Sequence, residues 1–189
     1  MKRFTWYHGI LLGIIAVAAF VRMVNLGTNP PAISWDEASI GYNAYTISTT
    51  GRDEHGTFLP LDTFAAFGDY KPPVPVYLTV PFVALLGLNE TTVRLPSALS
   101  GVLTVLVLYL LVLELFRTAK HAQALGLVAA GVLTITPWHI MLSRAAFEAN
   151  IALLFLVTGI WFVLKARESP VFFYVCWLPF VLGIYTFNS

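Results

Sequence analysis

Long apolar blocks separated by short polar connections are the feature that most constrains how this chain can fold. A helix needs about 20 apolar residues to cross the hydrocarbon core of a bilayer. The composition agrees with membrane spans, because 58% of the 189 residues are hydrophobic and 11% are charged. Soluble domains carry roughly 25% charged residues. The chain is therefore predicted to be an all-α, polytopic membrane protein.

The N-terminal segment combines a basic start, Lys2 and Arg3, with an apolar run from Ile10 to Val24. A cleaved signal peptide would share these features, and the AVA at 16–18 imitates a small-residue cleavage site. However, the apolar run continues past that site and further apolar blocks follow. An uncleaved first span is therefore predicted.

The distribution of Lys and Arg decides which later blocks cross the membrane. Basic residues in short connections favour the cytoplasmic side, and they occur in the connections 116–123 and 165–169. If the block 74–88 were a span, both connections would face outside. This block is short for a span and contains Pro75 and Pro81. We therefore expect it to lie along, or dip into, the outer interface, which places both basic connections inside.

This assignment gives five spans and one large outer loop. A structureless loop of such length would be unusual, so the outer loop, 26–95, is predicted to be folded and functional, with horizontal amphipathic helices. The chain stops near the outer end of its last predicted span. We therefore interpret 1–189 as the N-terminal part of a longer transmembrane module. The spans are predicted near 8–25, 96–116, 124–142, 148–164 and 170–187.

Charge and cysteine content exclude several classes of protein. A net charge of +1 without a Lys/Arg-rich run gives no support to a nucleic-acid partner. The single cysteine, Cys176, excludes an internal disulfide and a Cys-based zinc cluster. Transporters place ionisable groups near the bilayer midplane, whereas these spans carry charge only near their ends, at Arg22 and Glu114. A transporter fragment and a non-catalytic membrane subunit are kept as alternatives to an enzyme.

The segment ISWDEASIGYNAYT (33–46) places two adjacent carboxylates, Asp36 and Glu37, at the predicted start of a helix. Ser34 and Glu37 fit the S-x-x-E capping box, and Gly51 is a natural helix stop. An apolar stripe follows the helical spacing i, i+4, i+7. It consists of Ile40, Ala44 and Ile47.

Both carboxylates have a structural explanation as well as a catalytic one. Glu37 can cap the helix, and Asp36 in the first turn complements the helix dipole. Adjacent residues on a helix point about 100° apart. One carboxylate can therefore cap the helix while the other faces a cavity.

Two further charged sites are predicted on the outer face. Lys71 precedes two prolines, which forbid a helix through it and fix its position; a lysine that snorkels to lipid headgroups is the alternative. Arg144 and Glu148 lie four residues apart, and their alternative is a simple i, i+4 ion pair. Together with Asp36 and Glu37, these sites suit a reaction on a lipid-linked, anionic substrate.

Two histidines are candidate metal ligands, but neither has a clustered set of partner residues in the sequence. They are His55 and His139. We expect His139 to form an interfacial polar-aromatic edge with Trp138, beside a bend or helix end at Pro137.

A set of motifs in a fixed order resembles the N-terminal half of polytopic GT-C glycosyltransferases. The relevant branch contains the protein O-mannosyltransferases and the lipid A aminoarabinose transferases, and the resemblance covers nearly the whole chain. The motifs are R..NL (Arg22, Asn25, Leu26), WDEASIGYNAY, TGRDEHGTFLPL, GDYKPPVPVYL, LLGLNETTVRLPSALSG and TPWHIMLSRAAFEAN.

The resemblance implies transfer of a sugar, with inversion, from a polyprenyl-phosphate donor to an acceptor that the sequence does not identify. It implies a multi-pass protein of the plasma (bacterial inner) membrane, with its active site on the extracytoplasmic face. The catalytic acids map onto Asp36, with Glu37 beside it, and onto Glu148. Lys71 maps onto the residue that contacts the donor phosphate.

Breaking the anomeric bond leaves negative charge on the lipid phosphate, which Lys71, together with Arg144, is expected to stabilise. The acceptor hydroxyl needs a proton acceptor, for which Asp36 is the candidate. Tyr70 and Tyr77 complete the predicted substrate-binding residues. Aminoarabinose transferases carry an acid at the place of Tyr70, so the resemblance does not support their type of metal site. No cofactor is assigned, and a divalent metal stays an open alternative.

Overall fold

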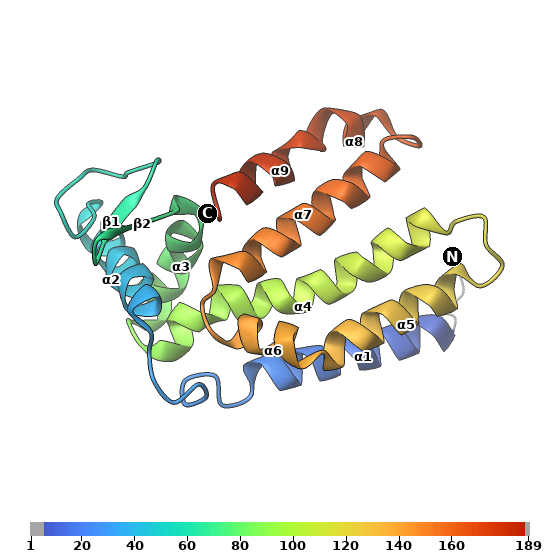
Figure 1. Ribbon diagram of the computed structural model, residues 1–189, viewed down its shortest axis with the longest axis horizontal. Coiled ribbons are helices and arrows are strands. Elements are labelled where there is room, and N and C mark those ends of the chain that lie inside the picture. Colours follow the sequence, from blue (N-terminus) through green and yellow to red (C-terminus); the bar gives the residue numbers. More distant parts are fainter. Residues whose placement is uncertain (1–5, 188–189) are drawn as a thin grey trace.

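The helices of the computed structural model form a bundle that carries a smaller layer at one end (Figure 1). The structure describes residues 6–187, so the predicted basic start, Lys2 and Arg3, lies outside the described residues. The helices are α1 (Trp6–Met23), α2 (Trp35–Thr50), α3 (Pro73–Leu86), α4 (Glu90–Leu115), α5 (Ala122–Ile135), α6 (Pro137–Arg144), α7 (Glu148–Lys165), α8 (Pro170–Val175) and α9 (Trp177–Ile184). The strands are β1 (Phe64–Ala66) and β2 (Asp69–Lys71).

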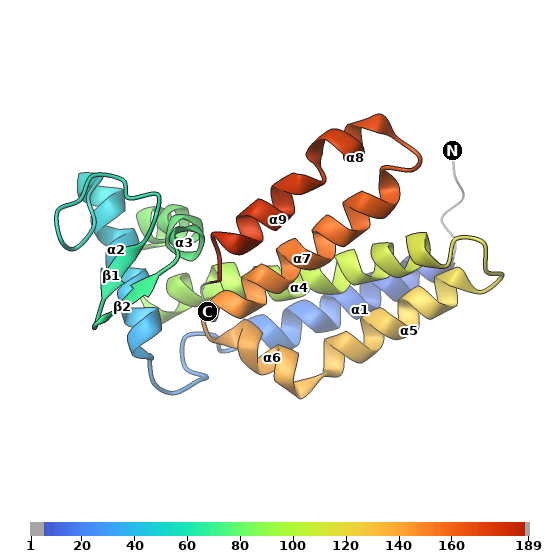
Figure 2. The ribbon, with the colours of Figure 1, turned by 45° about the horizontal axis from the view of Figure 1, so that its top comes forward.

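The bundle consists of α1, α4, α5 and α7, which run side by side, and its end layer consists of α2, the β1–β2 hairpin and α3 (Figures 1 and 2). The connections α4–α5 and α7–α8 lie at the opposite end, beside the start of α1. Ion pairs join these two connections, because Arg117 lies 2.6 Å from Glu168 and Lys165 lies 3.0 Å from Glu114. The structure thus gathers both basic connections at the end remote from the layer formed by 35–86.

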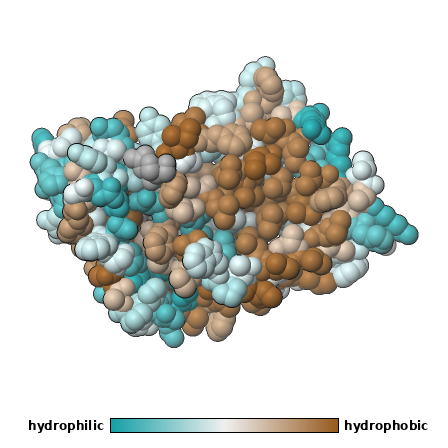
Figure 3. All heavy atoms as spheres, in the orientation of Figure 1, coloured by the Kyte–Doolittle hydropathy of each residue, from teal (hydrophilic) through white to brown (hydrophobic). Residues whose placement is uncertain are grey.

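Three described helices, α1, α4 and α7, are long and apolar enough to cross a membrane. The pair α5 and α6 would add a fourth span if its two bent parts cross together. The hydropathy surface agrees, since a broad hydrophobic region covers the bundle between two more hydrophilic ends (Figure 3). The prediction of an all-α, polytopic membrane fold is therefore confirmed. The count of five stays a prediction, because the block 170–187 forms the shorter apolar pair α8 and α9.

The hairpin of β1 and β2 was not predicted, because each strand has only 3 residues. Its strands pair antiparallel, with Phe64 opposite Lys71 and Ala66 opposite Asp69. The predicted span at 96–116 also begins earlier than expected, at Glu90. Asn89 caps α4 there, since its side chain accepts from the Thr92 amide while Thr92 bonds back to the cap.

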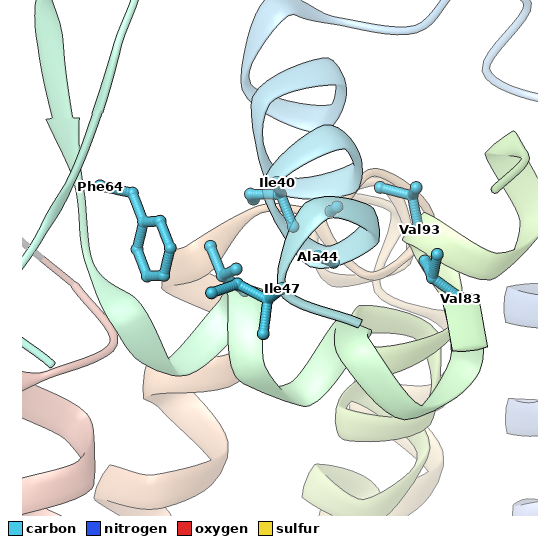
Figure 4. Close-up of a cluster of buried hydrophobic side chains, with 8 residues drawn as sticks. Ile40, Ala44, Ile47, Phe64, Val83 and Val93 are labelled. Atoms are coloured by element: carbon cyan, nitrogen blue, oxygen red, sulfur yellow. The ribbon is translucent and has the colours of Figure 1, made fainter. Parts of the chain in front are cut away.

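The predicted start and stop of α2 are confirmed. Ser34 and Glu37 form the capping box, and Gly51 closes the helix with the left-handed φ of 69° that glycine adopts without strain. The predicted apolar stripe is buried against α3, α4 and the hairpin (Figure 4). Burial of each such aliphatic side chain contributes about 1.5–3 kcal/mol. This core cluster comprises Ile40, Ala44, Ile47, Phe64, Val76, Val83, Val93 and Ala146.

The predicted bend at Pro137 is confirmed, since α5 and α6 meet at 60° around it. Proline has no N–H to continue the hydrogen-bond ladder. The Arg22 guanidinium from α1 donates instead to the carbonyls of Leu133 and Thr134, at 3.2 and 3.3 Å. Arg22 also donates to Nδ1 of His139 at 2.7 Å. The interfacial edge predicted for His139 is therefore wrong: contact with Arg22 buries its ring, and only Trp138 of that pair is exposed.

The close approach of α4 and α6 gives a test of the bundle. A Cβ added at Gly101 would lie 2.7 Å from Cβ of Ser143 and 3.1 Å from Nε of Arg22. We expect Gly101→Ala to destabilise the protein by about 1–3 kcal/mol, the usual cost of overpacking. Thermal unfolding in detergent micelles measures this. Gly13→Ala is the matched control, because nothing lies within 4 Å of its added Cβ, and equal melting temperatures for the two variants would contradict the packing.

Candidate active site

Lys71 is the last residue of β2 and directly precedes the proline pair. Pro72 has an extended backbone, with φ −66° and ψ 149°, and Pro73 begins α3. The proline ring fixes φ and disfavours a helical conformation in the residue before it. The predicted break in helical structure at Lys71 is therefore confirmed, and the side chain projects from a fixed strand end.

Two carboxylates hold the Lys71 ammonium. Its Nζ lies 2.8 Å from Oδ1 of Asp36 and 2.8 Å from Oδ2 of Asp69. Side chains two residues apart on a strand share a face, so Asp69 and Lys71 lie together on β2. Asp36 reaches them from the first turn of α2. The structure thus brings two predicted site residues, Asp36 and Lys71, into direct contact.

The two carboxylates secure the charge on Lys71. Burial by itself would lower the pKa of Lys71, but the hydrogen bonds to Asp36 and Asp69 outweigh burial and raise it above its ordinary value. In return, the hydrogen bond from Lys71, with a second from the Tyr70 amide N–H, lowers the pKa of Asp69. Lys71 and Asp69 therefore both carry their charges at neutral pH.

This cluster lines an open pocket of about 450 Å³ at the junction of α2 and the hairpin. Its lining contains three charged groups and two exposed aromatic rings. The pocket is large enough for a sugar-sized group and presents both hydrogen-bond acceptors and a cation. Its lining residues are Trp35, Asp36, Ala66, Phe67, Asp69 and Lys71.

Glu148 approaches the same cluster from the bundle side. It is the first residue of α7, and its charge interacts with those of Lys71, Asp36 and Asp69. Its Oε1 is buried and has no hydrogen-bond partner in the described part of the chain. The structure therefore places this predicted acid near enough to interact with the ion-paired cluster.

Glu37 occupies a different environment from its neighbour Asp36. Its Oε1 lies 2.6 Å from Nε of Arg94, and its Oε2 accepts from the Ser34 amide at 2.9 Å. Burial would raise the pKa of Glu37, but the hydrogen bonds from Arg94 and Ser34 outweigh burial and lower it. Both carboxylate oxygens of Glu37 therefore already accept hydrogen bonds from other groups of the protein. This geometry argues against the direct catalytic role that the resemblance implied for Glu37.

Arg94 is the partner that sequence reasoning missed. Besides Glu37, its guanidinium donates to three carbonyls of the α1–α2 connection, those of Leu26, Pro30 and Ala32, at 2.9–3.0 Å. Arg94 is 57 residues from Glu37 in the sequence, so no local pattern pairs them.

Arg144 does not face the pocket, contrary to its predicted role in substrate binding. Its guanidinium donates to the carbonyls of Val21, Val24, Asn25 and Asn29, at 2.8–3.3 Å. The alternative predicted from the sequence was an i, i+4 ion pair between Arg144 and Glu148. This pair does not form among the described residues either. The helix is broken between them, since Ala145 has extended angles of φ −96° and ψ 151°.

The two tyrosines predicted to bind substrate also lie outside this pocket. Tyr70 lies between Asp69 and Lys71 on β2 and therefore points to the opposite face of the strand, where it is exposed. The Tyr77 hydroxyl donates to the Pro60 carbonyl at 2.9 Å. Its ring lines a separate apolar groove between α3 and α9.

No group of three His, Cys, Asp or Glu side chains within residues 6–187 is arranged to hold a metal ion. Nε2 of His55 lies 3.0 Å from the carbonyl oxygen of Ala65, and Nδ1 of His139 contacts Arg22. The acid that sequence reasoning did not place in the site is Asp69. The D-Y-K spacing could have indicated this role, because residues two apart lie on one face of a strand and the segment forms β2.

These observations define a class of protein: a polytopic helical membrane protein with an ion-paired pocket in a layer at one end of its bundle. The sequence pattern of the family described as dolichyl-phosphate-mannose-protein mannosyltransferase matches residues 70–187. The chain belongs to this family of membrane glycosyltransferases of the GT-C type, and the resemblance stated from its motifs is confirmed.

The chain is also similar to a curated protein of Bacillus subtilis (strain 168) named "Putative mannosyltransferase YkcB". The two are 25% identical over 178 residues, which make up 93% of this chain and 23% of that protein. The chain therefore spans about a quarter of the length of this relative. No solved structure gives a significant match.

The ion pair of Glu37 and Arg94 provides a test of what stabilises the end layer. Removal of one partner from a buried ion pair leaves an uncompensated charge, at a cost of about 3–5 kcal/mol. We expect Arg94→Leu to destabilise the protein by that amount in denaturant unfolding. The double variant Arg94→Leu/Glu37→Leu, which leaves no lone charge, is expected to recover part of the loss. A single variant as stable as the wild type would contradict the structural role.

Proposed function

We propose that this chain forms the site-bearing part of an inverting membrane glycosyltransferase. The enzyme moves a sugar from a polyprenyl-phosphate donor to an acceptor hydroxyl on the outer face of the membrane. The observation that carries the proposal is the contact between Lys71, a charged ammonium, and Asp36, a carboxylate, in an open pocket beside the membrane spans. Family membership supports the reaction class.

Lys71 is the group proposed to bind the donor phosphate. An ammonium group has three N–H donors, and Lys71 gives one each to Asp36 and Asp69. The third is left for a phosphate oxygen. A fixed cation at this point stabilises the negative charge that the leaving polyprenyl phosphate acquires as the anomeric C–O bond breaks.

Asp36 is proposed as the general base. It pairs with Lys71 through Oδ1, and Oδ2 is available to the acceptor, because the side chain is 41% exposed. As the acceptor oxygen bonds to the anomeric carbon from the face opposite the phosphate, its proton passes to Asp36. The bond from that carbon to the phosphate oxygen breaks, and polyprenyl phosphate leaves with the electron pair. The anomeric configuration is thereby inverted.

Glu37 and Arg94 act as positioning residues in this scheme. Their ion pair fixes the first turn of α2 on α4, and Asp36 belongs to that turn. Glu148, the first residue of α7, is proposed as the second acid, because its carboxyl group interacts electrostatically with the Lys71 ammonium.

Charge asymmetry supports the proposed extracytoplasmic location. The two basic connections lie at the bundle end remote from the pocket (Figure 1), and short basic connections favour the cytoplasm. The pocket then faces the outside of the plasma (bacterial inner) membrane. A donor with a long lipid tail reaches it from the bilayer.

Asp36→Asn tests the general base. The amide keeps the shape of the side chain but accepts a proton poorly, so we expect transfer to fall by about 10²–10⁴-fold. Turnover of radiolabelled polyprenyl-phosphate sugars by the full-length protein measures this, with thermal unfolding as the check on folding. Near-normal transfer by a folded Asp36→Asn variant would contradict the proposal and favour a non-catalytic subunit.

Lys71→Ala tests phosphate recognition. Loss of the ammonium removes the charge-assisted hydrogen bond to phosphate, so we expect affinity for polyprenyl phosphate to fall at least about tenfold. Binding is measured by fluorescence quenching or calorimetry in nanodiscs. Lys165→Ala is the matched control, because that ammonium pairs with Glu114 and Glu168 at the bundle end remote from the pocket. Unchanged binding by Lys71→Ala would contradict the assignment.

A further inference from the structure

Two large aromatic side chains stand exposed at the charged pocket. Trp35 is 75% exposed and Phe67 is 74% exposed, and both line the same pocket as Asp36, Asp69 and Lys71. They come from different elements, Trp35 from the first position of α2 and Phe67 from the hairpin turn. Exposed rings of this size lose hydrophobic stabilisation unless something covers them.

Phe67 also has an unfavourable backbone conformation. It lies with Gly68 in a two-residue hairpin loop, between the paired Ala66 and Asp69. Both loop residues have positive φ, 52° for Phe67 and 81° for Gly68. Turns of this type favour Asn-Gly or Gly-Gly, because a bulky residue is strained at positive φ. A ring kept at a strained and exposed position is a reason to look for a function.

The combination of rings and charged groups is the chemistry that recognises a sugar. A pyranose ring presents apolar C–H faces, which pack on aromatic rings, and hydroxyl groups around its edge, which bond to carboxylates and ammonium groups. The pocket offers both kinds of surface within one volume of about 450 Å³. An apolar ligand would leave Asp36 and Asp69 without water, whereas a sugar can replace that water by hydrogen bonds.

We propose that Trp35 and Phe67 form the aromatic walls of the subsite that holds the transferred sugar ring of the donor. This inference rests on the proposed function, in which Lys71 binds the donor phosphate. A single oxygen links that phosphate to the anomeric carbon, so the ring attached to it must lie beside Lys71. The two rings that line the same pocket as Lys71 then contact the donor sugar, while the acceptor approaches from the side of Asp36.

The test compares three lipids that differ only in the sugar they carry or lack. Affinities of the full-length protein in nanodiscs are measured for polyprenyl-phosphate mannose, polyprenyl-phosphate glucose and sugar-free polyprenyl phosphate of the same chain length. We expect the wild type to bind at least one sugar lipid more tightly than polyprenyl phosphate. We expect Trp35→Ala to weaken binding of that sugar lipid about fivefold to tenfold, with binding of polyprenyl phosphate within about twofold.

Phe67→Asn separates the role of the ring from the role of the turn. Asparagine tolerates positive φ, so this variant relieves strain and completes the favoured Asn-Gly turn. We expect its melting temperature to equal or exceed that of the wild type, while its preference for the sugar lipid falls as in Trp35→Ala. Phe58→Ala is the control. Phe58 lies between α2 and β1 and is 65% exposed, but it does not line the pocket.

The outcomes distinguish this inference from the proposed function. Equal loss of affinity for all three lipids in Trp35→Ala and Phe67→Asn would show that the rings anchor the layer to the membrane, and would overturn the inference. Unchanged affinities, or a wild type without preference for either sugar lipid, would overturn it as well. Failure of the proposed function shows differently, as polyprenyl-phosphate binding that is insensitive to Lys71→Ala.

Discussion

The end layer of this protein, formed by α2, the β1–β2 hairpin and α3, depends on one guanidinium group, that of Arg94. It donates to both oxygens of Glu37 and to carbonyls of the connection between α1 and α2, which uses all five N–H groups of an arginine. Because Glu37 adjoins Asp36 on α2, fixing one carboxylate fixes the turn that carries the other. The relation of Asp36 to Lys71, on a separate strand, follows from this attachment and from the packing of α2 on α3.

The basic residues near the pocket have different roles, which depend on the groups that each one contacts. Arg22 and Arg144 donate to carbonyls at helix ends and breaks, which is how a buried guanidinium is tolerated beside a bilayer. Lys71 is the cation among the residues that line the charged pocket. We therefore propose that Lys71 recognises the anionic lipid phosphate, while the neighbouring arginines hold the framework in place.

Local patterns could be predicted from the sequence, and distant pairings could not. The capping box of Ser34 and the bend at Pro137 are dictated by neighbouring residues, so both predictions hold. Glu37 illustrates both cases. Its role in the capping box can be predicted from the adjacent residues, but its pairing with Arg94 cannot, because tertiary packing brings Arg94 to it across 57 residues. His139 was placed at an interface because nothing in its own segment reveals Arg22. The strand that puts Asp69 beside Lys71 is too short to give a hydrophobic period.

We propose that Lys71 and Asp36 form one site for a phosphate-linked sugar. An experimental structure of the full-length protein in nanodiscs with bound polyprenyl phosphate tests this directly. We expect a phosphate oxygen within hydrogen-bond distance of Lys71 Nζ, with the Asp36 carboxylate nearby and the lipid tail directed towards the spans. A phosphate bound elsewhere, with Lys71 still paired to both carboxylates and remote from it, would rule out this shared site.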